Sequence, residues 1–239
     1  MIWSNRGYRA IYLMLKVNRK GAFKMEFRMY SIEKFLNELS SDMPSPGGGS
    51  TAALVAALAS SLNSMVYSLT INKKAFEKLT NENKEKMIKF SHKAKNFTEL
   101  SQSFMERDRI EFMELMDSFK LPKDTEEEKS IRSKIIKEKT FKAMESPLDL
   151  ARECLDFYEN ISFAVEFGNK NLISDAGVAA ILLNAAIESS ILNVKINLNS
   201  LRKEEYAEEI EKECIYILEK SIEFKNNISK NVEKAIYPI

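Results

Sequence analysis

The spacing of hydrophobic positions is helical from residue 31 onward. Ile32, Phe35, Leu36 and Leu39 recur at intervals of three and four residues, which places them on one face of a helix. Ser31 stands immediately before them and is a favoured N-cap residue. No segment of the sequence shows the two-residue alternation of half-buried strands. The pattern therefore predicts a protein built from helices.

Prolines, glycines and capping residues divide this pattern into segments. Pro44 and Pro46 exclude a helix before the glycines that follow them. Ser146-Pro147 has a proline where the first turn of a new helix favours one. We expect helices over residues 31–39, from 50 to about 66, from 73 to about 119, from 125 to about 145, from 146 to a break at 169–175, from 176 through 186 and beyond, and from about 203 to 234.

Two of these segments are unusually rich in alanine and serine. One runs from Ser50 to Val66 and the other from Ala176 to Ala186, and each follows a short polar loop. Helices lined with small side chains are buried on most faces, because neighbouring backbones approach them closely. We therefore expect an all-α fold, a helical bundle in which two small-residue-rich central helices are covered by long amphipathic helices. The loops would place unpaired backbone N–H groups beside the core.

Length and composition favour one domain, which we expect to span residues 25–239. The chain has 239 residues, of which 44% are hydrophobic and 30% charged. Its 36 basic and 35 acidic residues give a net charge of +1, so the charge does not favour a nucleic acid or an anionic membrane as partner. No apolar run approaches the roughly eighteen residues that a membrane span requires. We expect neither partner.

Cysteine and histidine are too sparse for a metal site. Cys154 and Cys214 fall inside helical patterns and form no C-x-x-C pair, so we interpret them as buried or boundary thiols in a reducing cytoplasm. His92 is the one histidine and lies in a lysine-rich amphipathic stretch, where a surface position is the commoner outcome. A histidine-based metal site or catalytic triad is therefore excluded, and no metal is expected.

Residues 1–24 differ from the rest, because they carry six basic residues and no acidic one. A targeting peptide is basic in this way, but the apolar part at residues 10–15 is short and no small-residue cleavage site follows it. A basic arm is a second interpretation. We favour a third, in which translation starts at Met25 and residues 1–24 are a non-native or disordered extension.

The loop before the first small-residue helix reads Pro44-Ser-Pro-Gly-Gly-Gly-Ser50. It lacks the Gly-Lys-Ser/Thr ending of a phosphate-binding loop and no strand precedes it, which argues against a nucleotide site. Two interpretations stay open from the residues alone. One is a tight turn that lets two helices pack. The other is a loop whose glycines let a carboxylate or a flat ring approach the backbone.

Three segments, in order along the chain, resemble the formiminotetrahydrofolate cyclodeaminase family. They are residues 43–53 (MPSPGGGSTAA), residues 108–129 with Asp108 and the loop LPKDT, and residues 169–198 with the motifs SDAGVAA and LNVKINL. The likeness extends from about residue 31 to about residue 201. The chain departs from the family at Glu111, where alanine is usual, and at Ser189-Ser190, which replace a common glycine.

The resemblance implies an enzyme that acts on a one-carbon unit carried by tetrahydrofolate. The first expectation is a formiminotetrahydrofolate cyclodeaminase, which forms 5,10-methenyltetrahydrofolate and releases ammonia. The alternative is a methenyltetrahydrofolate cyclohydrolase, and the alternative of another class is a non-catalytic folate-binding bundle. The resemblance also implies a homodimer in which both subunits can contribute to the site. Neither reaction demands a metal or redox cofactor, so none is expected beyond the tetrahydrofolate-bound substrate.

Either reaction needs a folate folded so that its two nitrogens lie close, and a group that moves a proton. With the resemblance, Asp108 is the leading candidate, Asp175 the second, and Lys123 a cation that holds a folate carboxylate or assists proton transfer. Each residue also has a purely structural interpretation. Asp108 would then be a solvated helix residue, Asp175 a helix cap and Lys123 a surface lysine. The expected substrate-binding residues are Pro46, Gly47, Gly48, Gly49, Ser50, Ser174, Asn193 and Asn197, of which the two asparagines share a helix face.

Overall fold

The computed structural model describes residues 25–237. Its elements are η2 (Phe27–Met29), α2 (Ile32–Leu39), α3 (Gly48–Ser68), α4 (Lys74–Glu77), α5 (Asn81–Ser118), α6 (Glu126–Phe167), η3 (Lys170–Leu172), α7 (Ile173–Ser200) and α8 (Ala207–Ile236). No strand occurs among these described residues, so the predicted all-α class is confirmed. Residues 1–24, and with them the expectation of a start at Met25, lie outside the described range.

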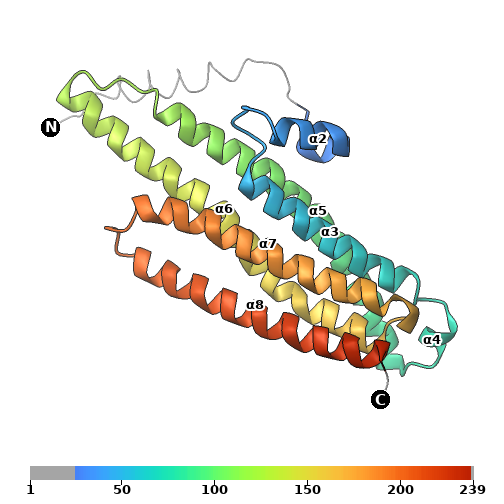
Figure 1. The fold of residues 1–239 in the computed structure, drawn as a ribbon. Helices are drawn as coiled ribbons and strands as arrows, with labels where there is room; N and C mark the ends of the chain where they lie inside the picture. The colour runs from blue at the N-terminus through green and yellow to red at the C-terminus, as the bar shows by residue number, and fades with distance from the viewer. Residues whose placement is uncertain (1–24, 238–239) are drawn as a thin grey trace.

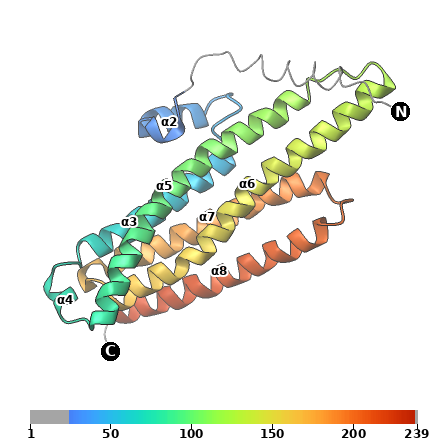
Figure 2. The ribbon, with the colours of Figure 1, turned by 180° about the vertical axis from the view of Figure 1, so that it is seen from behind.

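Five long helices, α3, α5, α6, α7 and α8, share one core (Figure 1). α3 packs against α5 and α7, and α6 packs against the same two helices, while α8 lies along α7 and α6. α3 and α7 are antiparallel, because Asn169 beside the start of α7 bonds Thr70 just after α3, whereas Asn193 near the other end of α7 lies against Gly48. Seen from behind, α5 and α6 form the opposite side of the bundle (Figure 2).

The two small-residue helices are central, as the sequence predicts. Ala56 and Ala59 of α3 and Ala179 and Ala180 of α7 have no exposed surface at all. Side chains of this size let the two helix backbones approach closely, and larger residues from α5 and α6 then close the core around them. The bundle is therefore organised around the α3–α7 contact.

The expectation that no segment is long and apolar enough for a membrane span is wrong. Gly48–Ser68 and Lys170–Ser200 both qualify by length and composition, because scattered Ser, Asn and Lys residues do not lower their mean hydropathy enough. Within the bundle, 56% and 50% of these spans are buried. The same residues therefore serve as the core helices of this fold.

Two predicted helix boundaries are also wrong. α6 continues through Pro147 as one helix, although a new helix was expected to begin at Ser146. Ser146 and Pro147 are both buried against neighbouring helices, and this packing compensates for the hydrogen bond that the proline ring removes. The predicted long helix from residue 73 is interrupted after α4, and α5 begins behind the N-cap Thr80. The helix expected from residue 125 is confirmed, because Thr125 is its N-cap and Glu128 completes a capping box.

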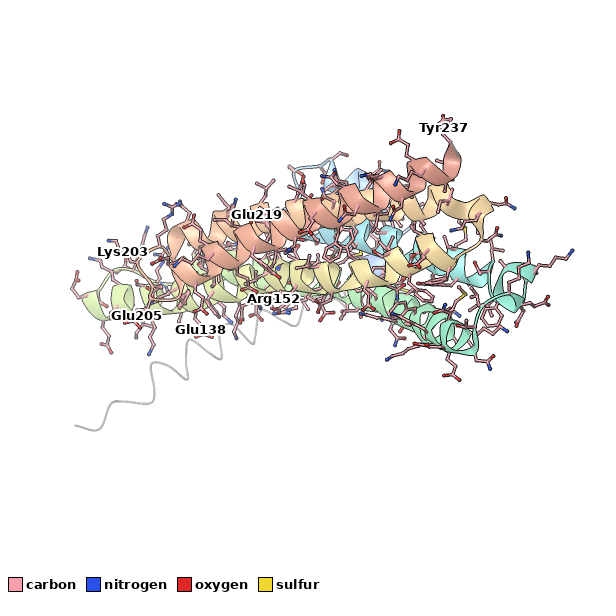
Figure 3. The ribbon with its side chains drawn as sticks, turned by 90° about the horizontal axis from the view of Figure 1, so that it is seen from below. Glu138, Arg152, Lys203, Glu205, Glu219 and Tyr237 are labelled. Carbon is pink, nitrogen blue, oxygen red and sulfur yellow. The ribbon has the colours of Figure 1, made fainter. Side chains whose placement is uncertain are left out.

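The outer helices carry charged surfaces (Figure 3). Arg152 of α6 donates two hydrogen bonds to the carboxylate of Glu213 on α8, at 2.6 and 2.7 Å, which fixes α8 against the bundle. α2 is less well covered, because Phe35 is buried against Phe27 whereas Ile32 on the same predicted face is 82% exposed.

Candidate active site at the N-terminus of α3

The glycine loop leads directly into the first turn of α3. Gly47 is the N-cap and Gly48 and Gly49 are helical, so the helix begins two residues before the predicted start at Ser50. The backbone N–H and the hydroxyl of Thr51 both donate to the carbonyl of Gly47, at 3.0 and 2.8 Å. These bonds fix the loop at a helix N-terminus, where backbone amides favour negative charge.

Asp108 of α5 lies against this helix start. The hydroxyl of Ser50 donates to its Oδ2 at 2.7 Å and lies 3.2 Å from the carbonyl of Met105. A Cβ atom added to Gly49 would overlap the Asp108 carboxylate, so only glycine leaves room for this contact. The glycine loop is therefore shaped around Asp108.

Asn193 of α7 reaches the same place from the opposite side. A Cβ atom at Gly48 would lie 3.1 Å from its Oδ1. Its amide nitrogen donates to the carbonyl of Ser189, and that of Asn197 donates to the carbonyls of Asn193 and Ala143. No hydrogen bond within residues 25–237 uses the amide oxygens of Asn193 and Asn197, so both oxygens can still accept one from a ligand.

Burial changes the acidity of two carboxyl groups here. Removal from water raises the pKa of Asp108, and the hydrogen bonds from the hydroxyl and amide of Ser50 partly oppose this effect. Burial also raises the pKa of Glu111, opposed by Arg107 and reinforced by the charges of Glu145 and Asp108. Asp108 therefore holds a proton more readily than an exposed aspartate, as a group that accepts and returns a proton requires.

The structure brings together only part of the predicted site. Gly48, Gly49, Ser50, Asp108 and Asn193 converge, with Gly47 as the N-cap and Pro46 buried just before them. Asn197 lies one helical turn beyond Asn193 and contacts Asn193 and Ala143.

The grouping of Ser174 and Asp175 with the glycine loop is wrong within one chain. Both lie in the first turn of α7, and Asn193 is eighteen residues further along, a separation of about 27 Å on a straight helix. Lys123 lies exposed on the loop between α5 and α6, away from Asp108. The catalytic roles suggested for Asp175 and Lys123 stay predictions.

Sequence reasoning missed the charged groups around Glu111. Arg107 donates to Oε1 of Glu111 at 2.9 Å and to Asp149 of α6 at 2.7 Å. Glu145 of α6 is close enough to act on Glu111 through its charge. Asp149 and Glu145 come from α6, so no spacing along the chain predicts their contact with this part of α5. Arg107 and Glu111 are four residues apart on α5, and that spacing could have paired them from the sequence.

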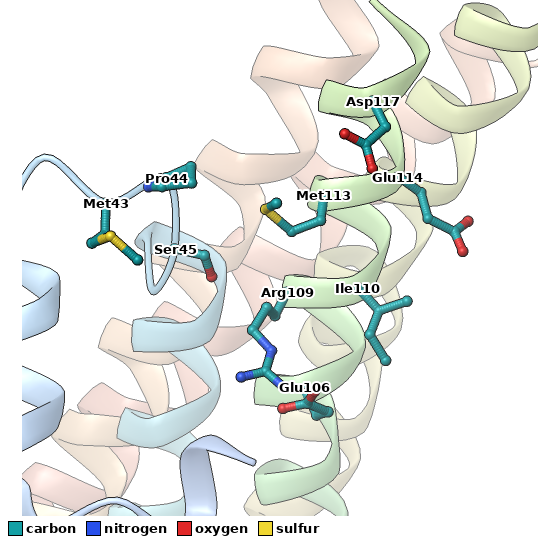
Figure 4. Close-up of a pocket in the computed structure, with 9 residues that line it drawn as sticks. All are labelled: Met43, Pro44, Ser45, Glu106, Arg109, Ile110, Met113, Glu114 and Asp117. Atoms are coloured by element: carbon teal, nitrogen blue, oxygen red, sulfur yellow. Dashed lines mark hydrogen bonds and ion pairs between the residues drawn. The ribbon is translucent and has the colours of Figure 1, made fainter. Parts of the chain in front are cut away.

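A cavity of about 470 Å³ lies on another face of α5, beside the first part of the loop (Figure 4). Met43, Pro44 and Ser45 form one wall, and Arg109, Ile110 and Met113 form the other. The buried hydroxyl of Ser45 has no partner among the described residues. Arg109 is held by Glu106 and by the carbonyl of Met25, and it lies over the ring of Phe27. Asp108 does not line this cavity.

Within residues 25–237 no group of three His, Cys, Asp or Glu side chains is placed to hold a metal ion. Cys154 and Cys214 are buried and unpaired, and His92 is exposed, as predicted.

Known proteins resemble the chain over most of its length. The family model described as formiminotransferase-cyclodeaminase matches residues 31–215. A methenyltetrahydrofolate cyclohydrolase of Methylorubrum extorquens is 34% identical over 206 residues, which are 86% of this chain and 97% of that protein. A formimidoyltransferase-cyclodeaminase of Rattus norvegicus is 30% identical over 74% of this chain, which spans only 32% of that longer protein. The crystal structure of formiminotetrahydrofolate cyclodeaminase from Thermotoga maritima matches with a TM-score of 0.70 and 26% identity, covering 89% of this chain and 98% of that one.

Proposed function

Because this chain belongs to the formiminotransferase-cyclodeaminase family, we propose that it is an enzyme acting on a one-carbon unit carried by tetrahydrofolate. The observation that carries the proposal is the placement of Asp108. Its carboxylate is half-buried against Gly49 and Ser50 at a helix start, and the side chain of Asn193 from α7 lies against the neighbouring Gly48. The glycine loop, Asp108 and Asn193, which meet there, are among the residues that carry the family resemblance in the sequence.

The reactions named for the relatives share one requirement. In both reactions a nucleophile attacks the one-carbon unit, which bridges N5 and N10 either before the reaction or after it. A proton then moves from the attacking group to the leaving group. Asp108 accepts that proton and returns it, and its negative charge stabilises the cationic carbon–nitrogen species on either side of the step. The amide oxygens of Asn193 and Asn197 accept hydrogen bonds from the N–H edge of the pterin ring and hold it beside Asp108.

Cyclodeamination of 5-formiminotetrahydrofolate is our first choice of reaction. N10 attacks the formimino carbon, its proton passes through Asp108 to the amine, and ammonia leaves as 5,10-methenyltetrahydrofolate forms. The solved Thermotoga maritima protein of this name, which this chain covers almost completely, supports it. Methenyltetrahydrofolate cyclohydrolase is the second choice, because the Methylorubrum extorquens relative is a stand-alone protein of nearly the same extent. The alternative outside the enzymes is a helical bundle that binds folate without catalysing a reaction.

We propose that the enzyme works as a homodimer in the cytoplasm and uses no cofactor besides the folate. An apolar strip on the outer face of α7 supports a second copy as partner, since Leu192 is 68% and Ile196 69% exposed. A twofold axis near the middle of α7 would set Asp175 of one copy opposite Asn193 of the other. Ser174 and Asp175 would then join the site from the partner subunit, although they are distant within one chain.

Two assays on the purified protein test the proposed function. The first measures ammonia released from 5-formiminotetrahydrofolate, and the second follows the near-ultraviolet absorbance of 5,10-methenyltetrahydrofolate as it is hydrolysed. We expect enzyme-dependent turnover of at least one substrate. A protein that binds tetrahydrofolate derivatives but turns over neither would show the non-catalytic bundle to be correct.

A further inference from the structure

Glu111 is the one departure from the family pattern that lies beside Asp108. It follows Asp108 by three residues on α5, so the two side chains leave the helix on neighbouring sides of the same face. Its Oε1 accepts a hydrogen bond from Arg107, whereas its Oε2 is buried and has no hydrogen-bond partner within residues 25–237. A buried carboxylate oxygen without a donor is costly unless a ligand supplies one.

The charges around Glu111 leave this region negative. Arg107 is shared between Glu111 and Asp149, and Asp149 is bonded by Arg152 as well. Asp108 is bonded by the uncharged Ser50. Glu145 of α6 also acts on Glu111 through its charge and has no partner among the described residues. Arg107 and Arg152 are thus both shared among the carboxylates of Glu111, Asp149 and Glu213, and Asp108 and Glu145 add further negative charge. The region therefore attracts a cation that can donate hydrogen bonds.

We propose that Glu111 is a specificity residue that accepts a hydrogen bond from the nitrogen of the formimino group and thereby selects 5-formiminotetrahydrofolate over 5,10-methenyltetrahydrofolate. This inference rests on the proposed function. A protonated formimino group is a cation with N–H donors on its terminal nitrogen. The methenyl carbon is also part of a cation, but it carries no N–H group.

Glu111 and Asp108 have different roles in the reaction, because only Asp108 transfers a proton. The N10–C bond forms, the N10 proton passes through the Asp108 carboxylate to the formimino nitrogen, and the bond from carbon to that nitrogen breaks to release ammonia. Glu111 holds this nitrogen in line for protonation and gains or loses no proton overall. A site that hydrogen-bonds an N–H group discriminates strongly against an analogue that lacks it, because its acceptor is then left unpaired.

Glu111→Ala and Glu111→Gln test the inference, each assayed for kcat and KM with both substrates. For the alanine variant we expect the ratio of kcat/KM for the formimino substrate to kcat/KM for the methenyl substrate to fall about ten- to a hundredfold, the effect of losing a hydrogen bond to a charged group. The glutamine variant keeps an acceptor oxygen and the shape of the side chain, so its ratio should fall less. Glu99→Ala, an exposed glutamate on the same helix, is the matched control.

Three outcomes would overturn the inference. They are an unchanged ratio, a parallel loss of both activities in both variants, and a wild-type enzyme that hydrolyses the methenyl substrate but does not use the formimino substrate. Each of these leaves the proposed function standing. A wild-type protein inactive with both substrates would instead refute the proposed function itself.

Discussion

Gly49 has no side chain, and the Asp108 carboxylate occupies the space that a Cβ atom at this position would fill. Gly49→Ala forces Asp108 to move, so we expect kcat to fall at least about tenfold, since a displacement of about 1 Å at a reacting group costs this much or more. Gly177→Ala is a suitable control, because its methyl group would meet only the side chain of Val232, far along α7 from Asn193. Steady-state kinetics of both variants, with circular dichroism to verify folding, makes the comparison. Wild-type kcat in Gly49→Ala would contradict the fitted contact.

The raised pKa of Asp108 predicts a pH-dependent stability. Its unfolded pKa is about 3.9, so between that value and the higher folded pKa the native state binds more protons than the unfolded state. The free energy of unfolding contributed by Asp108 therefore falls as pH rises through this window. We expect Asp108→Asn to gain stability relative to wild type on going from acid to neutral pH, measured by urea unfolding across the range. A difference that is constant with pH, or that grows in favour of wild type, would contradict the burial of this carboxylate.

At the scale of helices, three buried polar groups join α3, α5 and α6. Asn160 accepts from Asn63 at 2.6 Å and donates to the carbonyl of Phe90 at 2.9 Å, and the hydroxyl of Tyr67 donates to its backbone carbonyl. Asn160→Ala removes the bonds of its side chain to Asn63 and to the carbonyl of Phe90 and leaves the Asn63 amide unpaired in the core, whereas Tyr67 keeps its bond to the backbone carbonyl of residue 160. We therefore expect the free energy of unfolding to drop by about 1–3 kcal/mol. Chemical denaturation measures this, with the exposed Asn96→Ala as control. Equal stabilities of the two variants would show that the network does not hold the helices together.

Helix positions were predictable from sequence where local chemistry decides them. The Thr125–Glu128 capping box and the Ser31 cap act within four residues, and both occur where expected. Pro147 shows the limit of this reasoning, because burial against other helices keeps α6 continuous there. The same limit applies to the site. The glycine loop and Asp108 could be predicted, but the pairing of Arg107 with Asp149 depends on where α6 lies. Ser174 and Asp175 look close to Asn193 in the sequence and are held apart by the length of α7.

At the scale of the whole molecule, the homodimer proposal makes a direct prediction. Leu192→Asp/Ile196→Asp places two charges on the apolar outer face of α7, and burying them in an interface is costly. We expect the dimer to dissociate at least about tenfold more readily, as measured by sedimentation velocity, and activity to fall in step because Asp175 of the partner subunit leaves the site. Ile215→Asp on the outside of α8 is the control and should stay dimeric. A variant at positions 192 and 196 that remains dimeric would place the interface elsewhere.

The central claim is that the Asp108 carboxylate, held at the start of α3, moves the proton in folate one-carbon chemistry. The most direct test is kcat for Asp108→Asn with whichever substrate the wild type prefers, measured beside Glu99→Ala. Asparagine preserves the shape of the side chain and can still accept from Ser50, but it cannot take up a proton. We predict that kcat falls about 100- to 10,000-fold while substrate binding is nearly unchanged. An Asp108→Asn enzyme that keeps the wild-type kcat would contradict the account.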